Sequence, residues 1–421
     1  MHRGWTLSDL GITGFASGKT LEAAHAAAIA RALTPLEREI KTDDGPGSLG
    51  EVARWDDLAR EVYCVLGIPI DAIDMATLIS AVENAAVHKT PFLISTVNLN
   101  YLVTSQHDPE FHQSLLCSNL CPADGMPIIW IARLLRIPIK RRVAGSDLFA
   151  TINATKRARK MKVFLFGGTE AAAVAAASAI NKSLGGWCCV GHFCPGFGSV
   201  ETMSQDDVID AINASGGDFL LVALGSRKGQ IWLLRNHDRL QISVRAHLGA
   251  TLHFAAGTIR RAPAIVAKLG LEWLWRIKEE PHLWRRYWRD GVALLRLMYR
   301  YVLPLALRTY WQHWFGNNAR QDLIIEQAEA GDSTVLRLSG AAVERNVAKA
   351  TSVMRQAVAS KRHMTINLAK TSIIDARFLG LLLMLKKRVN EQGGDLKFVD
   401  ASARLKRTFD RNGAGFLLAA Q

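Results

Sequence analysis

One aspartate has the setting of a residue that could move a proton. Asp124 lies in the turn-like sequence Pro-Ala-Asp-Gly at 122–125, directly before the nearly uncharged run MPIIWIARLL. Partly apolar surroundings make a carboxylate more basic, because burial disfavours its charged form. Such a group can accept the proton of an attacking hydroxyl group. An aspartate before glycine also stabilises turns, so these residues alone leave two interpretations open, a general base and a turn residue.

Glycine turns that follow apolar runs are a second candidate for chemistry. Apolar runs reach glycine at 161–168 (MKVFLFGG), 218–226 (DFLLVALGS) and 242–250 (ISVRAHLGA). Backbone N–H groups at such turns can approach a phosphate group closely. Each glycine taken singly is more simply explained as a turn residue. Three such turns in one domain are consistent with a ligand that carries phosphate.

The elements that must hold these residues alternate between strands and helices. PFLISTVN (91–98) has the pattern of a buried strand, and 170–183 that of an alanine-rich helix. This alternation predicts an α/β fold with a Rossmann-like, mostly parallel sheet that is covered on both faces. Such sheets bind ligands at the carboxyl ends of their strands. The residues expected at those ends are Thr96, Asn98, Gly167, Gly168, Gly225 and Gly249.

Length and composition indicate more than one globular domain. The chain has 421 residues, of which 49% are hydrophobic and 21% charged. Its formal net charge of +14 indicates an anionic partner: nucleic acid, an acidic membrane surface or a phosphorylated small molecule. The six cysteines form no CxxC pair, which argues against a structural zinc site. With no signal-peptide pattern and no apolar run long enough to span a membrane, we expect a cytoplasmic protein with reduced thiols.

Residues 281–320 have the composition of a membrane-surface element. They contain seven arginines but one acidic residue, and six of the eleven tryptophans lie between 273 and 314. Four of the arginines share one helical stripe, with aromatic and apolar residues largely opposite, and Pro304 should kink or end the helix. The alternative is a helix that packs its apolar face on its own domain. The aromatic content favours the inner face of the cytoplasmic membrane, and no nucleic-acid-binding module accompanies the charge.

Four segments follow from these patterns. Residues 1–60 are expected to be a weakly structured extension, and 61–280 the main α/β domain. The basic aromatic segment occupies 281–320. Residues 321–421 contain two strands, then a helix, a strand, a helix, a strand and a last helix, which predicts a compact second α/β domain of ordinary size.

The main domain resembles the TagA/WecG/CpsF family of inverting glycosyltransferases, which make teichoic acid, enterobacterial common antigen and exopolysaccharide repeat units. The likeness covers roughly 65–290 and rests on seven blocks in order. They are TVNLNYLV (96–103), PADGMPIIW (122–130), RRVAGSDL (141–148), VFLFGGTE (163–170), LVALGSRKGQIW (221–232), GATLHFAAGTIRRAP (249–263) and GLEWLWRIKEEPHLWRR (270–286).

The resemblance implies transfer of a sugar from a UDP-sugar to a hydroxyl group of a polyprenyl-diphosphate-linked saccharide, without a metal or other cofactor. One base must then remove the acceptor proton, and the leaving diphosphate must be neutralised. Matched by position, Asp124 would be that base, and Arg142 would bind phosphate through its fork of donors. The other positions that the resemblance assigns to the substrate site are Thr96, Asn98, Asp147, Gly167, Gly168, Gly225, Lys228, Gln230 and His253, together with Arg276, Arg285 and Arg286, which would close the site over the lipid-linked acceptor.

The chain departs from the family pattern in two places. The family often has Gly-x-Pro-Lys-Gln-Glu where this chain has Gly225-Ser-Arg-Lys-Gly-Gln230, and its frequent aspartate is replaced by His253. A neutral Gln230 beside the positive Arg227 would tolerate a uronic acid donor as well as one of the N-acetylmannosamine type. The changes also support an alternative, a catalytically inactive, transferase-like scaffold that acts through its C-terminal domain.

Residues 321–421 resemble a STAS domain, the fold of anti-sigma-factor antagonists and transporter tails. The likeness is carried by 363–400. In regulatory members a phosphorylated serine follows an aspartate at the start of a helix, whereas here Ala376 follows Asp375. We therefore expect no phosphorylation switch at this position, but a module for a protein partner or for self-association.

Overall fold

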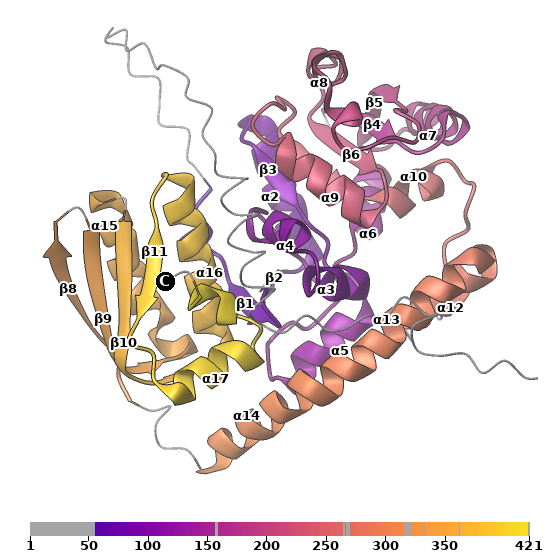
Figure 1. Cartoon of the computed structure of the whole chain (residues 1–421). Coiled ribbons are helices and arrows are strands. Elements are labelled where there is room, and N and C mark those ends of the chain that lie inside the picture. The colour runs from indigo at the N-terminus through magenta and orange to yellow at the C-terminus, as the bar shows by residue number, and fades with distance from the viewer. Residues whose placement is uncertain are drawn as a thin grey trace, which may run out of the picture.

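Two α/β domains lie side by side, and a long helical segment runs along both of them (Figure 1). The structure, a computed structural model, describes residues 55–419 apart from 156–158, 264–265, 267–269, 316–320, 332 and 362. The expected N-terminal extension falls largely on 1–54, outside the described residues. Its last residues belong to the fold, because Asp57–Ala59 (η2) form a short 3-10 turn and Leu58 is buried.

The N-terminal domain is built on a five-stranded parallel sheet with the order β3-β7-β6-β4-β5. This confirms the predicted parallel sheet, and β5 is a strand that the sequence analysis did not identify. Strand β3 is shorter than the predicted run, because the chain leaves the sheet before Thr96. The strands are Phe92–Ile94 (β3), Met161–Gly167 (β4), Trp187–Phe193 (β5), Phe219–Ala223 (β6) and Val244–His247 (β7).

Alternate side chains of each strand enter two separate cores, so both faces of the sheet are covered. On β4, Val163 and Leu165 join one core, whereas Phe164 and Phe166 join the other. This is the expected period of two residues for a strand buried on both faces. The first core is closed by Met75–Val87 (α2), Gly145–Ala154 (α6), Glu170–Lys182 (α7) and Gly249–Ala255 (α10), and the second by Asp206–Ala214 (α8) and Ser226–Arg235 (α9).

A third core lies beside the sheet and supports the segment that carries Asp124. It brings together an antiparallel hairpin, three helices and the inner side of the long helical segment. Residues Ile128 and Ile131 are buried in it, so the apolar run after Asp124 is a buried helix, as predicted. The hairpin and helices are Val62–Val65 (β1), Ile68–Asp71 (β2), Leu99–Ser105 (α3), Pro109–Leu116 (α4) and Met126–Leu134 (α5).

The long helical segment continues past Pro304, where the sequence predicted a kink or an end. A π-type turn lies directly before the proline, and the Leu303 N–H donates to the Met298 carbonyl oxygen, five residues back. This wider turn accommodates a residue that has no N–H of its own. Among the described residues, no helix is long and apolar enough to cross a membrane. The parts are Glu272–Glu279 (α12), Trp284–Leu297 (α13), Met298–Val302 (η5) and Leu303–Phe315 (α14).

The C-terminal domain has a four-stranded sheet in the order β11-β10-β9-β8, in which only the β8–β9 pair is antiparallel. Every element that the sequence predicted for this domain is present. The elements are Ile324–Ala330 (β8), Ser333–Ala342 (β9), Val347–Ser360 (α15), His363–Ile374 (β10), Ala376–Glu391 (α16), Leu396–Val399 (β11) and Ala403–Arg411 (α17).

Helix α16 packs directly on strand β1 and joins the two domains into one core. Val62 and Cys64 of the hairpin belong to the same buried cluster as α16. A side chain at Gly380 would place its Cβ 2.1 Å from the Val62 carbonyl oxygen, so only glycine permits this approach. Arg377 adds hydrogen bonds to the carbonyl oxygens of Val62 and Arg60, at 3.2 and 3.1 Å.

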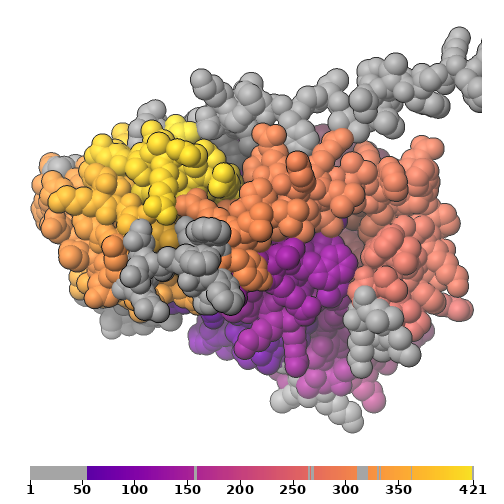
Figure 2. Space-filling view, turned by 90° about the horizontal axis from the view of Figure 1, so that it is seen from below, coloured from indigo at the N-terminus to yellow at the C-terminus, as the bar shows by residue number. Residues whose placement is uncertain are grey.

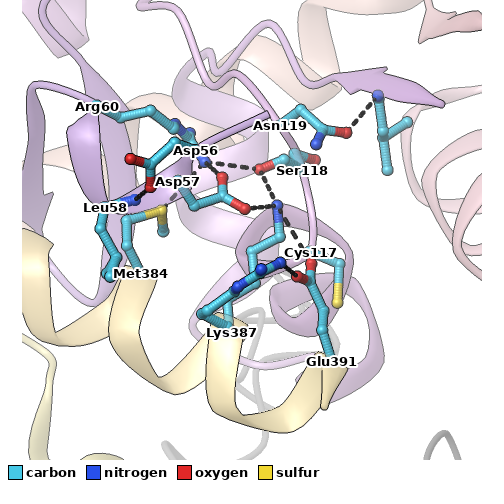
Figure 3. Close-up of polar contacts among 12 residues, drawn as sticks. Asp56, Asp57, Leu58, Arg60, Cys117, Ser118, Asn119, Met384, Lys387 and Glu391 are labelled. Atoms are coloured by element: carbon cyan, nitrogen blue, oxygen red, sulfur yellow. Dashed lines mark hydrogen bonds and ion pairs between the residues drawn. The ribbon is translucent and has the colours of Figure 1, made fainter. Parts of the chain in front are cut away.

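A buried ion cluster strengthens this junction (Figure 3). Lys387 on α16 lies 2.9 Å from the Asp57 carboxylate, which also pairs with Arg60 at 2.6 Å. Arg60 in turn pairs with Asp71 at 2.7 Å, and all four side chains are buried. The Asp71 carboxylate accepts the Cys121 N–H. The cluster therefore extends from the C-terminal domain to the segment that carries Asp124, three residues further on.

Candidate active site

Asp124 is held beside the carboxyl end of strand β3. The preceding residue, Ala123, forms a bridge with Val97 just after β3. The Asp124 N–H donates to the Val97 carbonyl oxygen over 2.7 Å. Gly125 follows with a φ of +119°, in the region that favours glycine, and helix α5 begins after it. The turn interpretation and the functional interpretation of Asp124 are thus compatible, because the turn fixes where the carboxyl group lies.

The Asp124 carboxyl group is a weaker acid than that of an ordinary aspartate. Burial is the main reason that its pKa is raised to about 7. The positive charge of Arg142 opposes this shift, while Asp147 and Glu272 add to it. A carboxylate with a pKa near 7 accepts protons far more readily than an exposed one and is still largely ionised in slightly alkaline solution.

Arg142 lies close enough to influence Asp124 and is held by two carboxylates. It lies 3.0 Å from Asp147 of α6, and it also pairs with Glu272 of α12. Arg261 approaches Asp147 from the other side, at 3.4 Å. The predicted phosphate-binding arginine is therefore already neutralised in this arrangement. A phosphate group that bound Arg142 would have to compete with Asp147 and Glu272.

The predicted glycine turns line the same edge of the sheet. Gly167 ends β4 and Gly168 follows it, with φ values of +101° and +75°. A Cβ at Gly167 would lie 2.6 Å from the Ala223 carbonyl oxygen, so the close approach of β4 and β6 requires glycine there. Gly225 directly precedes α9, and nothing lies within 4 Å of the position its Cβ would take. Of these three glycines, Gly225 therefore has open space beside it, whereas the Gly168 N–H already donates to the Ala223 carbonyl oxygen over 3.0 Å.

Thr96 and Asn98 lie at the end of β3 and differ in their accessibility. Thr96 is buried, with its methyl group against Gly145. Asn98 is partly exposed, and its side-chain oxygen accepts the Tyr101 N–H over 3.2 Å, which fixes the start of α3. Of the two predicted pocket residues, Asn98 is therefore the one whose side chain can still reach a ligand.

Two predicted substrate residues on α9 have protein partners. Gln230 is fully buried, accepting from the Ser95 hydroxyl and donating to the Tyr101 hydroxyl, each over 3.1 Å. This corrects the prediction of direct substrate contact for Gln230, because its position on the helix turns the side chain into the core. Lys228 donates to the Gly198 carbonyl oxygen over 2.6 Å and thereby joins α9 to the loop after β5.

The predicted basic residues of the helical segment separate into inward and outward groups. Arg276 is partly buried and lies over the Phe254 ring at 5.5 Å. Arg285 is exposed and lies over the Trp284 ring at 5.8 Å, so the structure does not bring it to the site. His253, on α10, is partly exposed and lies 3.3 Å from the Thr258 hydroxyl.

Arg286 reaches over the strand ends from α13. It lies 3.9 Å from Asp290, which accepts a 3.4 Å hydrogen bond from Asn100 on α3. Asn100 in turn accepts from the Ser226 hydroxyl at the start of α9, over 2.8 Å. Burial, and to a smaller extent the charge of Arg286, lowers the pKa of His247 at the end of β7. Helix α13 therefore brings a basic side chain close to the carboxyl edge of the sheet.

Sequence reasoning did not identify three residues that the structure adds to this site. Glu272 and Tyr101 lie inside blocks that carry the family resemblance, but only their distant partners reveal their roles. His247 ends an apolar strand run and had no signal of its own.

Within the described part of the chain, no group of three His, Cys, Asp or Glu residues is arranged to hold a metal ion.

Comparison with known proteins decides the family. The family model described as "Glycosyl transferase WecG/TagA/CpsF family" matches residues 63–307, more than half of the chain. This chain belongs to the WecG/TagA/CpsF family. Residues 325–418 match the STAS domain, which confirms the second resemblance. The family match runs beyond 280, so it includes much of the basic helical segment. We call 63–307 the transferase domain and 325–418 the STAS domain.

Curated relatives of the transferase domain carry one specific name. An N-acetylglucosaminyldiphosphoundecaprenol N-acetyl-beta-D-mannosaminyltransferase of Bacillus spizizenii is 24% identical over 225 residues, covering 52% of this chain and 85% of that protein. A protein of the same name from Staphylococcus aureus strain MW2 is 26% identical over 235 residues, covering 53% of this chain and 86% of the relative. The predicted glycosyltransferase class is therefore confirmed.

Proposed function

We propose that this chain is an inverting glycosyltransferase that moves a sugar of the N-acetylmannosamine type from a UDP-sugar to a polyprenyl-diphosphate-linked saccharide. The product would enter a cell-surface polysaccharide or exopolysaccharide. The observation that carries the proposal is the setting of Asp124, a carboxyl group with a pKa of about 7 at the carboxyl edge of a parallel sheet. The names of the relatives support the choice of sugar and acceptor.

The proposed reaction is a single displacement. Asp124 accepts the proton of the acceptor hydroxyl group while the oxygen of that hydroxyl group forms a bond to the anomeric carbon. The bond between that carbon and the diphosphate breaks, and its electron pair leaves with UDP. Arg276 and Arg286, two basic residues of the helical segment, would neutralise the negative charge that develops on the leaving group. The attack comes from the face opposite the leaving group, so the anomeric configuration inverts.

A donor of the N-acetylmannosamine type fits better than a uronic acid. The argument for a uronic acid needed a neutral Gln230 and a free Arg227 near the donor. Gln230 is buried, and Arg227 pairs with Asp108. Neither side chain is therefore available to favour an acidic sugar.

A donor screen tests the proposed function. Purified full-length protein is given a lipid-linked N-acetylglucosamine acceptor and, in turn, UDP-ManNAc, UDP-ManNAcA, UDP-GlcA and UDP-GlcNAc, and UDP release is measured. We expect release with UDP-ManNAc, and only when the acceptor is present. Release with a uronic acid donor alone would overturn the sugar assignment, and no release with any donor would favour the inactive scaffold.

The activity should depend on pH through Asp124. A general base works only when it is deprotonated, and burial raises its pKa to about 7. We therefore expect kcat/KM to rise about tenfold per pH unit below pH 7 and to level off above it. The measurement is kcat/KM from pH 5 to 9 in one buffer series. A profile that is flat between pH 5 and 7 would remove Asp124 as the titrating base.

We also propose that the helical segment binds the inner face of the cytoplasmic membrane, where a polyprenyl-linked acceptor is anchored. Its outward side exposes Trp288, Leu295 and Tyr299, at 69%, 70% and 81%. Figure 2 shows the segment lying across both domains on one side of the molecule. Arg308 of α14 donates to the Thr408 hydroxyl of α17 over 2.8 Å, so the exposed arginines of α17 adjoin the same surface. Aromatic rings and arginines together suit lipid headgroups.

Replacing Trp288, Leu295 and Tyr299 together with serine is expected to weaken membrane binding by about tenfold or more, because three highly exposed apolar side chains of the segment are lost. The measurement is co-sedimentation with vesicles that contain phosphatidylglycerol. The matched control replaces Val87, Leu184 and Phe197, which are exposed on other elements, with serine. Equal binding by both variants would show that the segment is not the membrane surface.

A further inference from the structure

His247 has a ring nitrogen that no part of the described protein satisfies. It is the last residue of β7, at the edge of the sheet where Asp124 and the glycine turns lie. The ring is nine-tenths buried, and its Nδ1 lies 2.9 Å from the Tyr101 hydroxyl. Its Nε2 is buried and has no hydrogen-bond partner among the described residues. A buried polar atom without a partner is costly, and ligand sites are where such atoms are retained.

A chain of buried hydrogen bonds determines which ring nitrogen of His247 carries the proton. Ser95 donates to Gln230, and Gln230 donates to the Tyr101 hydroxyl. The Tyr101 proton then points to Nδ1 of His247, so the neutral ring carries its own proton on Nε2. Burial and the nearby charge of Arg286 lower the pKa of His247 to about 4, so the ring is neutral at physiological pH. Nε2 is thus a prepared hydrogen-bond donor.

Gly229 gives the second, independent observation. It lies inside helix α9, where glycine is less favourable than alanine by about 1 kcal/mol. A Cβ at this position would lie 2.3 Å from Cδ2 of His247 and 3.2 Å from Nε2. The ring of His247 therefore occupies the space that a side chain at 229 would need. Gly229 is one of the positions at which this chain departs from the common family sequence.

We infer that His247 donates a hydrogen bond from Nε2 to the diphosphate of the bound sugar nucleotide, and that Gly229 is glycine to leave room for its ring. The inference rests on the proposed function, because it needs a nucleotide-sugar donor. Gly225, which follows the neighbouring strand β6, would let the backbone approach the same anionic group, since nothing lies within 4 Å of its Cβ position. His247 would then be a donor-binding residue rather than a proton-transfer group.

UDP binding to the full-length protein tests this assignment by calorimetry, independently of turnover. We expect His247→Ala to weaken UDP binding about 10- to 100-fold, the effect of losing one hydrogen bond to a charged group. His247→Gln, which can place an amide N–H near the Nε2 position, should recover part of that loss. Thermal unfolding of each variant verifies that it is folded. Unchanged UDP affinity in folded His247→Ala would overturn the assignment, including the case in which only the KM of the sugar donor rises.

Gly229 supplies a coupled test. Gly229→Ala should displace the ring and weaken UDP binding as much as His247→Ala does. The double variant Gly229→Ala/His247→Ala should be no weaker than His247→Ala alone, because the added methyl group no longer has a ring to displace. Additive losses would show that Gly229 acts independently of His247. If the wild-type protein does not bind UDP at all, the proposed function fails before this inference is reached.

Discussion

Asp124→Asn is expected to lower kcat by about 10²- to 10⁴-fold, the range that general-base catalysis contributes. Asparagine has nearly the same shape but cannot accept the acceptor proton. The KM for the donor should change little, since the proposed donor contacts lie on the glycine turns and on His247. The measurement is steady-state turnover of the donor selected by the screen, with the lipid-linked acceptor present.

Stability separates this loss of activity from a loss of folding. The pKa of Asp124 is raised above its ordinary value of 3.8, so the folded state holds its proton more tightly than the unfolded chain. The stability gained in this way is complete below pH 3.8 and is lost as the pH rises through about 7. At pH 8 the ionised group therefore opposes folding, and Asp124→Asn should unfold at the same or a higher temperature than wild type. An inactive variant that also unfolds early would leave the base unassigned.

Lys387→Met is expected to destabilise the whole molecule by about 3–5 kcal/mol, because it leaves the buried Asp57 with one cation fewer. Asp57 and Arg60 lie before the family match, and Lys387 lies in the STAS domain. The cluster is thus made largely by parts of the chain outside the common family domain. It ends at Asp71, whose carboxylate holds the backbone of Cys121, close to Asp124.

Tryptophan fluorescence makes this prediction specific. All eleven tryptophans lie before residue 321, so they report only on the transferase side. Lys387→Met should nevertheless shift the fluorescence transition in urea by the same amount as the circular dichroism transition. Arg388→Met is the control: Arg388 is the next residue on α16, and its ion-pair partner among the described residues is Glu391, near the surface. This substitution should change stability by less than about 1 kcal/mol. An unshifted fluorescence transition would show that the domains unfold independently.

The regular elements could be predicted from the sequence because their signals are local. Strands β4, β6 and β7 are apolar runs that reach glycine, and the elements of the STAS domain follow one another with clear breaks. Strand β5 carries a glycine, a histidine and two cysteines, so its pattern did not stand out. The π-type turn before Pro304 could not be foreseen, because it depends on packing against the third core.

The site could be predicted only in part, because its decisive contacts join distant residues. Asp124 was identified from its turn and its family block. The pairing of Arg142 with Glu272 spans 130 positions, and no local pattern indicates it. Gln230 has the spacing of a substrate residue, but the rotation of α9 buries it. His247 could be identified only from the structure, by its unsatisfied Nε2 and by its ring, which occupies the Cβ position of residue 229.

The anomeric configuration of the product tests the central claim most directly. Wild-type protein is incubated with UDP-ManNAc, whose sugar is α-linked, and the lipid-linked acceptor, and the product linkage is determined by NMR. A single displacement assisted by Asp124 predicts a β-linked product from wild type and none above background from Asp124→Asn. An α-linked product, or a β-linked product formed equally well by Asp124→Asn, would contradict the account.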